Sequence, residues 1–258
     1  MVGRTSESSL RVVSLAPSAT SILCAIGAKK ELVGVTKWCA DVAPVTGLPE
    51  LGDCWQMDSI DEILNLNPSL VIGSVPYKQE TVAKLLEHRL NFLAMNPRSL
   101  ADIENDIHLL GRITNHFQHA HRVVKQMRQE FAAIAKRSRL LRKKLRIYCE
   151  AWPNPRISSP PWVAEIVKIC GGEMVLPPGQ KVTDEQVAQA EPDLIVLAWA
   201  ATGDQAKVEK AYRVAAWKNL PAIRNKRVYV VRDELLNTPG PPLVAGAKQL
   251  LRIFREAT

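Results

Sequence analysis

One stretch of this chain occurs twice, and the repeat limits which folds are open to it. Residues 57–74 read MDSIDEILNLNPSLVIGS, and residues 181–198 read KVTDEQVAQAEPDLIVLA. Each copy has a hydroxyl residue followed by a Glu or Gln partner, a short helical stretch, a proline and an apolar strand. The matching pairs are Ser59 with Thr183, Glu62 with Gln186, and Pro68 with Pro192. These features in register predict two related α/β lobes, with a capping box at the start of each repeated helix.

Apolar strands alternate with helical stretches on both sides of the repeat. The clearest strands are RVVSL at 11–15, LVIG at 70–73, LRIYC at 145–149 and VYVV at 228–231. Buried strands that alternate with helices are typical of parallel sheets. We therefore predict an α/β protein with two Rossmann-like lobes and parallel sheets. The N-terminal lobe covers 1–98, linking helices cover 99–143, and the C-terminal lobe covers 144–258.

The linking segment is predicted to contain one long helix. Apolar residues recur at helical spacing between His116 and Leu140, and the segment has almost no glycine or proline after Gly111. The recurring positions are Val123, Val124, Met127, Phe131, Ile134 and Ala135. An unbroken helix over this range would be roughly 35 Å long at 1.5 Å per residue. We expect it to join the lobes as a single long rigid helix that permits little hinge motion.

Positive charge is concentrated in one run of the chain. The 258 residues have a formal net charge of +8, and much of the excess lies in RSRLLRKKLR at 137–146. Such a run can bind an anionic partner such as nucleic acid or a membrane surface. It can also be a solvated helix end, where cations complement the helix dipole. Because no stacking aromatics or nucleic-acid-binding motif accompany the run, we favour the helix end and expect no nucleic-acid partner.

Three features bear on where the protein works. No apolar run approaches the ~20 residues that cross a bilayer, and residues 1–10 have no apolar leader segment. The protein is therefore expected to be cytoplasmic if the sequence is complete, and periplasmic or otherwise extracytoplasmic if a leader was removed. The five cysteines are odd in number and lack CxxC spacing, which suits a reducing compartment and argues against a zinc site.

Nothing in the sequence predicts catalysis. The chain has no GxSxG motif, no phosphate-binding loop and no HExxH motif. All five histidines lie between positions 88 and 121. On a helix only His116 and His119 of the HFQHAH stretch would share a face, and no carboxylate stands at a clear ligand spacing. We therefore expect no enzyme, no metal site and no intrinsic cofactor.

Tryptophans gather where strands lead into helices. Those in or beside such connections, or directly after a repeat strand, are Trp38, Trp55, Trp152, Trp162 and Trp199. Open α/β sheets bind ligands outside the carboxyl ends of their strands, and indoles there supply large flat contact surfaces. Any one of them could equally pack on the core of its lobe, but five together favour a ligand site. Trp55 is the strongest candidate, because the equivalent loop of the second copy, PPGQKV at 177–182, has no tryptophan.

Long segments of the chain resemble the cobalamin-binding branch of the ABC-transporter substrate-binding proteins with a rigid interdomain helix. The segments are RVVSLAPSAT at 11–20, LVGVTKWCAD at 32–41, GDCWQMDSIDEILNLNPSLVIGS at 52–74, YCEAWPNPRISSPPWVAEIVKICGGEMVL at 148–176, VTDEQVAQAEPDLIVLAW at 182–199 and residues 217–231. They cover nearly the whole chain. The resemblance implies a non-catalytic protein that holds cobalamin or a related corrinoid in a cleft between two lobes, for ABC-type uptake.

The resemblance also implies roles for individual residues. The ligand contacts would be Trp38, Trp55, Ser74, Pro76 and Tyr77 in the N-terminal lobe, and Trp152, Trp162 and Trp199 in the C-terminal lobe. Trp152 would contact the ligand from the C-terminal lobe, as Trp55 would from the N-terminal lobe. Ser74 stands where some relatives carry an aromatic residue. Acidic residues that dock onto arginines of a membrane permease would be Glu80 and Glu209, one on each lobe.

Several alternatives stay open at the level of the sequence. The ligand could instead be a ferric siderophore or haem, since the resembling segments are less specific for corrinoids than for the superfamily. The missing leader favours a cytoplasmic corrinoid-handling factor or enzyme on the same fold. Cys39 and Cys54 each adjoin an expected ligand tryptophan, so they could form a disulfide outside the cytoplasm. We expect a monomer.

Overall fold

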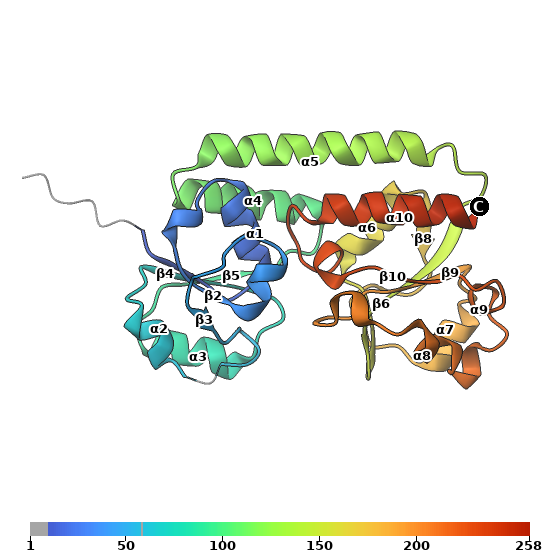
Figure 1. Ribbon diagram of the computed structural model, residues 1–258, viewed down its shortest axis with the longest axis horizontal. Coiled ribbons are helices and arrows are strands. Elements are labelled where there is room, and N and C mark those ends of the chain that lie inside the picture. The colour runs from blue at the N-terminus through green and yellow to red at the C-terminus, as the bar shows by residue number, and fades with distance from the viewer. Residues whose placement is uncertain (1–9, 58) are drawn as a thin grey trace, which may run out of the picture. The chain divides into compact units, whose positions relative to one another are not determined.

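The computed structural model describes residues 10–57 and 59–258. Residues 1–9, which carry the expectation of no secretory leader, and residue 58, in the first repeat, lie outside the described residues. The described chain divides into two compact units (Figure 1). The first contains the residues up to Asn96 together with Asn105–Val123, and the second contains Pro97–Glu104 together with Val124–Thr258. Each unit has its own sheet with helices on it, so the prediction of a two-lobed α/β protein is confirmed.

The first unit is built on a parallel sheet with the strand order β3-β2-β1-β4-β5. The strands are β1 (Val12–Ser14), β2 (Leu32–Thr36), β3 (Glu50–Leu51), β4 (Leu70–Ser74) and β5 (Phe92–Met95). Helix α1 (Pro17–Ala25) lies on one face, and α2 (Asp61–Asn65) and α3 (Gln79–Glu87) lie on the other (Figure 1). The connections from β1 and β4 leave in opposite directions across the sheet. These neighbouring strands therefore form the switch point at which α/β sheets bind ligands.

The second unit repeats this plan with the strand order β10-β9-β6-β7, and β8 also pairs with β6. The strands are β6 (Leu145–Pro153), β7 (Arg156–Ser158), β8 (Gly172–Met174), β9 (Leu194–Leu197) and β10 (Val228–Val230). Its helices are α6 (Pro161–Ile169), α7 (Asp184–Gln189), α8 (Val208–Tyr212), α9 (Pro221–Arg224) and α10 (Leu243–Ala257). Connections diverge from the neighbours β6 and β9, which form the switch point of this sheet.

The prediction of parallel sheets holds for the paired strands of both units, with the exception of β6 and β7. These two strands are antiparallel, with Trp152 opposite Ile157. The connection between them is Asn154–Pro155, which is far too short for the crossover that a parallel pair needs. The chain therefore turns back on itself at the carboxyl end of β6, beside the switch point.

Both copies of the repeat build the same backbone frame. Arg11 donates from Nη2 to the carbonyl at the end of α2 (2.7 Å), and Arg146 donates from Nη2 to the carbonyl at the end of α7 (2.8 Å). The residue before each repeat proline is left-handed, with φ 43° at Asn67 and φ 44° at Glu191. Few residues other than glycine adopt such angles. The two units thus share an unusual local geometry as well as a sequence pattern.

The two repeated helices begin differently, however. In the second copy the capping box forms, because the Gln186 N–H donates to Thr183 Oγ1 (3.2 Å) and the Thr183 N–H donates to Gln186 Oε1 (2.8 Å). In the first copy the expected box at Ser59 and Glu62 is wrong. Ile60 is already helical (φ −72°, ψ −28°), so the Ser59 hydroxyl meets the N–H of Asp61 at 3.1 Å instead.

Two helices that contribute residues to both units form a helical hairpin, α4 (Leu100–Ile113) and α5 (Phe117–Ser138). Helix α5 runs unbroken for 22 residues, which confirms the long helix expected between His116 and Leu140. Its buried positions follow the helical spacing and include Ala120, Val124, Met127, Phe131 and Ile134. Within residues 10–57 and 59–258, no helix combines the length and the apolar character needed to cross a membrane.

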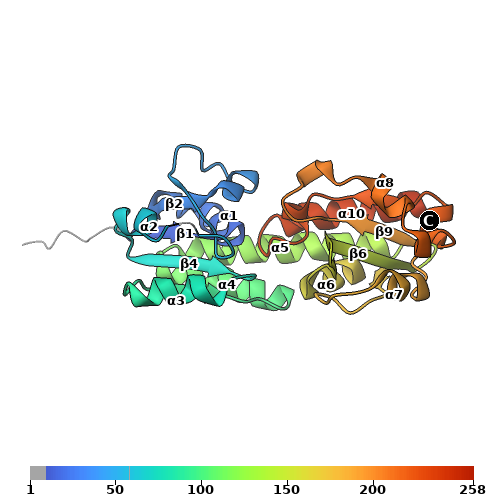
Figure 2. The same ribbon diagram turned by 90° about the horizontal axis from the view of Figure 1, so that it is seen from below.

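The remaining helical elements are short 3-10 turns. They lie at Lys29–Glu31 (η1), Lys37–Asp41 (η2), Gly203–Gln205 (η3), Ala215–Trp217 (η4) and Asp233–Leu235 (η5). The second turn, η2, follows β2 directly and carries one of the expected ligand tryptophans. Figure 2 gives the view from below, in which β1, β2 and β4 of the first unit and β6 and β9 of the second can be followed.

Candidate functional site

The expected contacts of the first unit gather at the carboxyl edge of its sheet. Trp38 lies in η2, directly after β2, and Trp55 lies in the loop after β3. Ser74 is the last residue of β4, and Pro76 and Tyr77 follow it. Because β2, β3 and β4 belong to one parallel sheet, their carboxyl ends meet at the same edge.

Trp55 is held in place by its loop and yet remains open to solvent. The Asp53 carboxylate accepts from the Trp55 N–H at 2.8 Å, and the Lys78 N–H donates to the Cys54 carbonyl at 3.0 Å. A Cβ on Gly73 of β4 would stand only 2.4 Å from Cys54 Sγ, so the strand needs glycine where the loop packs on it. The backbone around Trp55 is therefore pinned, while 53% of the residue is exposed.

A lysine lies over each of the two indoles in this unit. Lys37 Nζ is 4.5 Å from the centre of the Trp38 ring, and Lys78 Nζ is 5.3 Å from the centre of the Trp55 ring. Cations are attracted to the face of an indole over such distances. A ligand that stacks on these faces would displace the ammonium groups to its rim, where they could meet acceptor atoms.

The loop after β4 contributes a different set of groups. Ser74 is buried, and its hydroxyl has no hydrogen-bond partner among the residues that the structure describes. Pro76 is exposed, whereas Tyr77 packs against the apolar cluster that contains Cys54. This loop and the Trp55 loop therefore form one packed surface.

The three tryptophans expected in the second unit have unequal surroundings. Trp152, in β6, is 41% exposed, and its indole N–H donates to the Asn154 carbonyl at 2.9 Å. Trp162, in α6, is buried and donates to the carbonyl of Leu236. Trp199 is also buried, and it follows β9. Of these three, Trp152 is the one that presents a broad indole surface to solvent.

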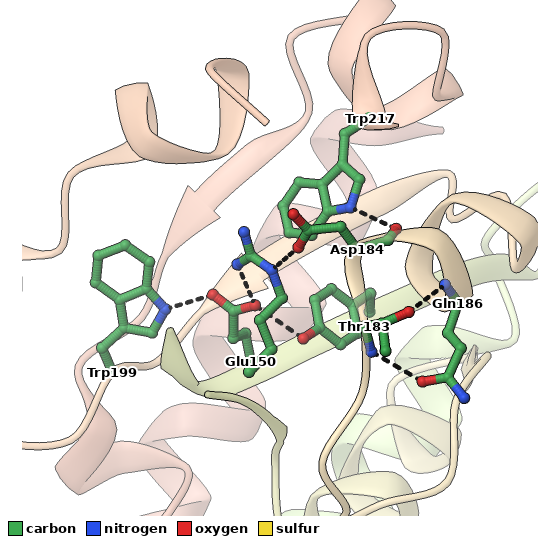
Figure 3. Close-up of polar contacts among 8 residues, drawn as sticks. Glu150, Thr183, Asp184, Gln186, Trp199 and Trp217 are labelled. Atoms are coloured by element: carbon green, nitrogen blue, oxygen red, sulfur yellow. Dashed lines mark hydrogen bonds and ion pairs between the residues drawn. The ribbon is translucent and has the colours of Figure 1, made fainter. Parts of the chain in front are cut away.

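A buried carboxylate connects the ends of β6 and β9. Glu150 is fully buried, and its Oε1 accepts from the indole N–H of Trp199 at 2.8 Å (Figure 3). Its Oε2 accepts from the Tyr148 hydroxyl and from Arg156 Nη1, each at 2.8 Å. Burial and the neighbouring Glu150 carboxylate raise the pKa of Tyr148, so the phenol stays protonated and remains a donor. The carboxylate therefore has three donors in place of water.

Arg156 extends this network to α7 and η4. Its Nε donates to the Asp184 carboxylate, and its guanidinium lies 4.2 Å from the centre of the Trp217 ring. The Trp217 indole in turn donates to the Asp184 carbonyl at 3.0 Å (Figure 3). Burial alone would lower the pKa of Arg156, but the charges and hydrogen bonds of Glu150 and Asp184 outweigh it and raise the pKa. The guanidinium is permanently charged and fixed in orientation.

Reasoning from the sequence did not anticipate this network. One signal was available, because Glu150 is the single charged residue in the stretch YCEAW at 148–152, within an apolar strand. A buried carboxylate requires donors, so Glu150 itself indicated a polar site. Its partners are far from obvious, since Trp199 lies 49 positions away and the contact depends on β6 pairing with β9.

The two acidic residues expected to dock onto a permease occupy equivalent places. Glu80 lies in the first turn of α3, after β4, and Glu209 lies in the first turn of α8, after β9. Both residues are exposed. Each therefore follows a switch-point strand of its own unit.

The two cysteines beside the expected ligand tryptophans are free thiols. Cys39 and Cys54 are both free and buried, and Thr20 donates to Cys39 Sγ at 3.0 Å. Burial and then the nearby Asp53 carboxylate raise the pKa of Cys54 to about 12. Across the described ranges, no group of three or more His, Cys, Asp or Glu residues is placed to hold a metal ion.

Comparison with known proteins identifies the family. The vitamin B12-binding protein of Vibrio parahaemolyticus is 28% identical over 241 residues, which cover 90% of this chain and 84% of that protein. The ABC transporter substrate-binding lipoprotein YvrC of Bacillus subtilis is 24% identical over 252 residues, covering 93% of this chain and 78% of that protein. The apo periplasmic heme-binding protein RhuT of Roseiflexus sp. RS-1 superposes with a TM-score of 0.82 at 22% identity, covering 96% of this chain and 99% of that chain. The sequence profile of the family described as periplasmic binding protein matches residues 12–235, so this chain belongs to the periplasmic binding protein family.

Proposed function

We propose that this protein binds cobalamin or a related corrinoid and delivers it, outside the cytoplasm, to an ABC-type permease. The observation that carries the proposal is a pair of open indoles, Trp55 and Trp152, each at the carboxyl edge of its own sheet. The relative named as a vitamin B12-binding protein supports the choice of ligand. The relative named as an ABC transporter substrate-binding lipoprotein supports the choice of partner. The proposal assigns no catalytic step.

The chemistry of a corrinoid suits the groups at the first edge. A corrin has broad apolar faces, which can stack on Trp55 and Trp38, and polar amide-bearing edges. The buried Ser74 hydroxyl has no partner among the described residues and is available to an edge group. In this proposal Trp38, Trp55, Pro76 and Tyr77 supply surface, and Ser74 supplies a hydrogen bond. In the second unit Trp152 supplies surface, while the buried Trp162 and Trp199 are held by hydrogen bonds to Leu236 and Glu150.

Titration of the protein with cyanocobalamin tests the proposal. We expect binding heat and quenching of tryptophan fluorescence, and Trp55→Ala should weaken binding by about 1–3 kcal/mol if the indole is an anchor. Phe117→Ala is the matched control, because Phe117 is an aromatic residue of the same unit that is 45% exposed at the start of α5. Its affinity should equal that of the wild type.

Two results would reject the corrinoid. One is the absence of heat and quenching at tens of micromolar cyanocobalamin. The other is haem or a ferric siderophore binding more tightly than cyanocobalamin in parallel titrations followed by visible absorbance. An unchanged affinity in Trp55→Ala would remove Trp55 from the site and leave the ligand to be explained by other contacts.

A further inference from the structure

A pocket of about 220 Å³ opens within the second unit, beside the ends of β6 and β9. Its polar lining consists of Glu150, Asn154, Arg156 and Lys210, and Trp199 provides an aromatic wall. The pocket therefore lies at the switch point of the second sheet, where an α/β unit receives its ligand. All of these groups belong to one unit, so its geometry depends on that unit alone.

The Glu150 carboxylate in this pocket already accepts hydrogen bonds from the protein. Glu150 accepts from Tyr148, Arg156 and Trp199, and none of it is exposed. A ligand donor would have to compete with these three bonds. Glu150 therefore acts as support for the neighbouring side chains more readily than as an acceptor for a ligand.

Arg156, by contrast, has donors to spare. Its Nε and Nη1 are used by Asp184 and Glu150, whereas Nη2 has no acceptor among the residues that the structure describes. About 15% of its side chain is exposed. The Trp217 ring and the two carboxylates fix the plane of the guanidinium before any ligand arrives. Lys210 adds a second donor, with its Nζ 5.2 Å from the centre of the Trp199 ring.

The charges of the site determine which acceptor fits. Arg156 is paired with two carboxylates, Glu150 and Asp184, so its immediate surroundings carry net negative charge. Lys210 is exposed, so solvent screens its charge and the local excess of negative charge at Arg156 remains. A ligand carboxylate placed at Arg156 would be repelled by Glu150 and Asp184 in a partly dehydrated site. An uncharged carbonyl oxygen would accept the same hydrogen bonds without that repulsion.

We propose that this pocket binds a peripheral carboxamide of the ligand through its carbonyl oxygen, that Arg156 Nη2 is the donor, and that the pocket discriminates against a carboxylate at that position. The inference rests on the proposed corrinoid function, since corrinoids carry carboxamides around the ring. It assigns Arg156 as a specificity-determining residue and Lys210 as an assisting donor.

The test compares cyanocobalamin with derivatives in which a single peripheral carboxamide has been hydrolysed to a carboxylate. Wild-type protein should bind at least one of these acids about 10-fold or more weakly than the parent, because Glu150 and Asp184 repel the carboxylate that replaces the carboxamide. Arg156→Lys keeps the charge but lacks the fork of N–H groups. It should weaken the parent by a similar factor and reduce the difference between the parent and that acid.

Lys210→Met should produce a smaller loss of the same kind, and Lys218→Met, at another exposed lysine, should produce none. Thermal unfolding of each variant shows whether it is folded, and if Arg156→Lys is not, the wild-type ligand series and Lys210→Met decide. Equal affinity of the wild type for the parent and every single acid overturns the carboxamide assignment, while the corrinoid function stands. Absence of any corrinoid binding rejects both proposals.

Discussion

Trp55 and Trp199 both follow strands at a sheet edge, yet their surroundings give them different tasks. Trp199 is buried, and its indole N–H donates to Glu150. Trp55 stands on a loop fixed by Asp53, and over half of it faces water. An exposed indole on a fixed backbone has less conformational freedom to lose on binding a ligand. Residue type and position alone could not separate the two roles, because the difference arises from a buried carboxylate on a neighbouring strand.

At the same scale, three of the five cysteines should react slowly with thiol reagents. Burial raises the pKa of Cys54, Cys149 and Cys170 to about 12, from 9.0. Because the thiolate is the reactive form, its fraction near pH 8 falls by about a thousandfold. We expect iodoacetamide to modify these residues in the native protein far more slowly than in urea, with mass spectrometry assigning each site. Modification of Cys54 at the rate of a free thiol would contradict this expectation.

The same pKa values predict how stability changes at high pH. The folded protein keeps these thiols protonated up to about pH 12, whereas the unfolded chain ionises near pH 9. The folded state therefore binds more protons in that interval, and its stability should be complete below pH 9 and should fall as the pH rises toward 12. Cys54→Ala should reduce the slope of unfolding free energy against pH in this range, as measured by urea unfolding.

At the scale of elements, the sequence predicted what depends on local periodicity. The apolar spacing from Val123 to Ala135 located α5, and the repeat located the strands β4 and β9. The antiparallel β7 was missed, because its three residues have no period of their own and pair only after β6 has formed. The polar network around Glu150 was missed for a related reason, since its donors come from separate parts of the chain.

In both units a side chain after the repeated helix accepts a hydrogen bond from the start of the first strand, but the side chain differs. In the second unit Asp193 Oδ2 accepts from the Arg146 N–H at 2.9 Å, and its Oδ1 accepts from Lys143 Nζ at 2.7 Å. In the first unit Ser69 Oγ accepts from the Arg11 N–H at 3.2 Å. Each side chain therefore ties the segment after the repeated helix to the start of the first strand of its sheet.

This difference predicts a pH dependence that belongs to the second unit. Burial opposes ionisation of Asp193, but Lys143 and the Arg146 N–H outweigh burial and hold its pKa below the ordinary value of 3.8. Its stabilisation is therefore present above about pH 4 and is lost as the pH falls further. Asp193→Asn should lower the unfolding free energy by about 1–2 kcal/mol at pH 7 and flatten its decline toward pH 2.

Urea unfolding at pH 7 and at a series of lower values down to pH 2 measures both effects. Ser69→Ala is the matched control, because it removes the equivalent acceptor without removing a charge. It should cost less at pH 7 and leave the acid dependence unchanged. If Asp193→Asn shows the same acid profile as the wild type, the ion pair with Lys143 does not control acid stability.

At the scale of the whole molecule, each unit has an acidic residue in the first helical turn after its switch strand. Glu80 and Glu209 are the candidates for contact with the proposed permease. The double charge reversal Glu80→Lys with Glu209→Lys should leave cyanocobalamin affinity unchanged. It should reduce cyanocobalamin uptake by roughly tenfold or more, because like charges at an interface cost several kcal/mol. Uptake is measured in cells of the source organism from which the gene for this protein has been deleted and to which each variant is returned.

Reversal of two other exposed acidic residues, Glu87 and Glu191, gives the matched control with the same change in net charge. The control should support normal uptake. Equal uptake by both double variants would show that Glu80 and Glu209 do not dock, and a fall in ligand affinity would place them at the ligand instead.

The arginine at the end of each repeated helix bears on how the two halves of the chain are related. Arg11 and Arg146 donate to the equivalent carbonyl in their respective copies. The residue after that carbonyl is left-handed in both copies, although the neighbouring amino acids differ. Duplication of an ancestral unit accounts for such agreement, whereas the Trp55 loop and the Glu150 network occur in one unit each. The frame is therefore common to the two halves, whereas the groups proposed to touch the ligand differ from one half to the other.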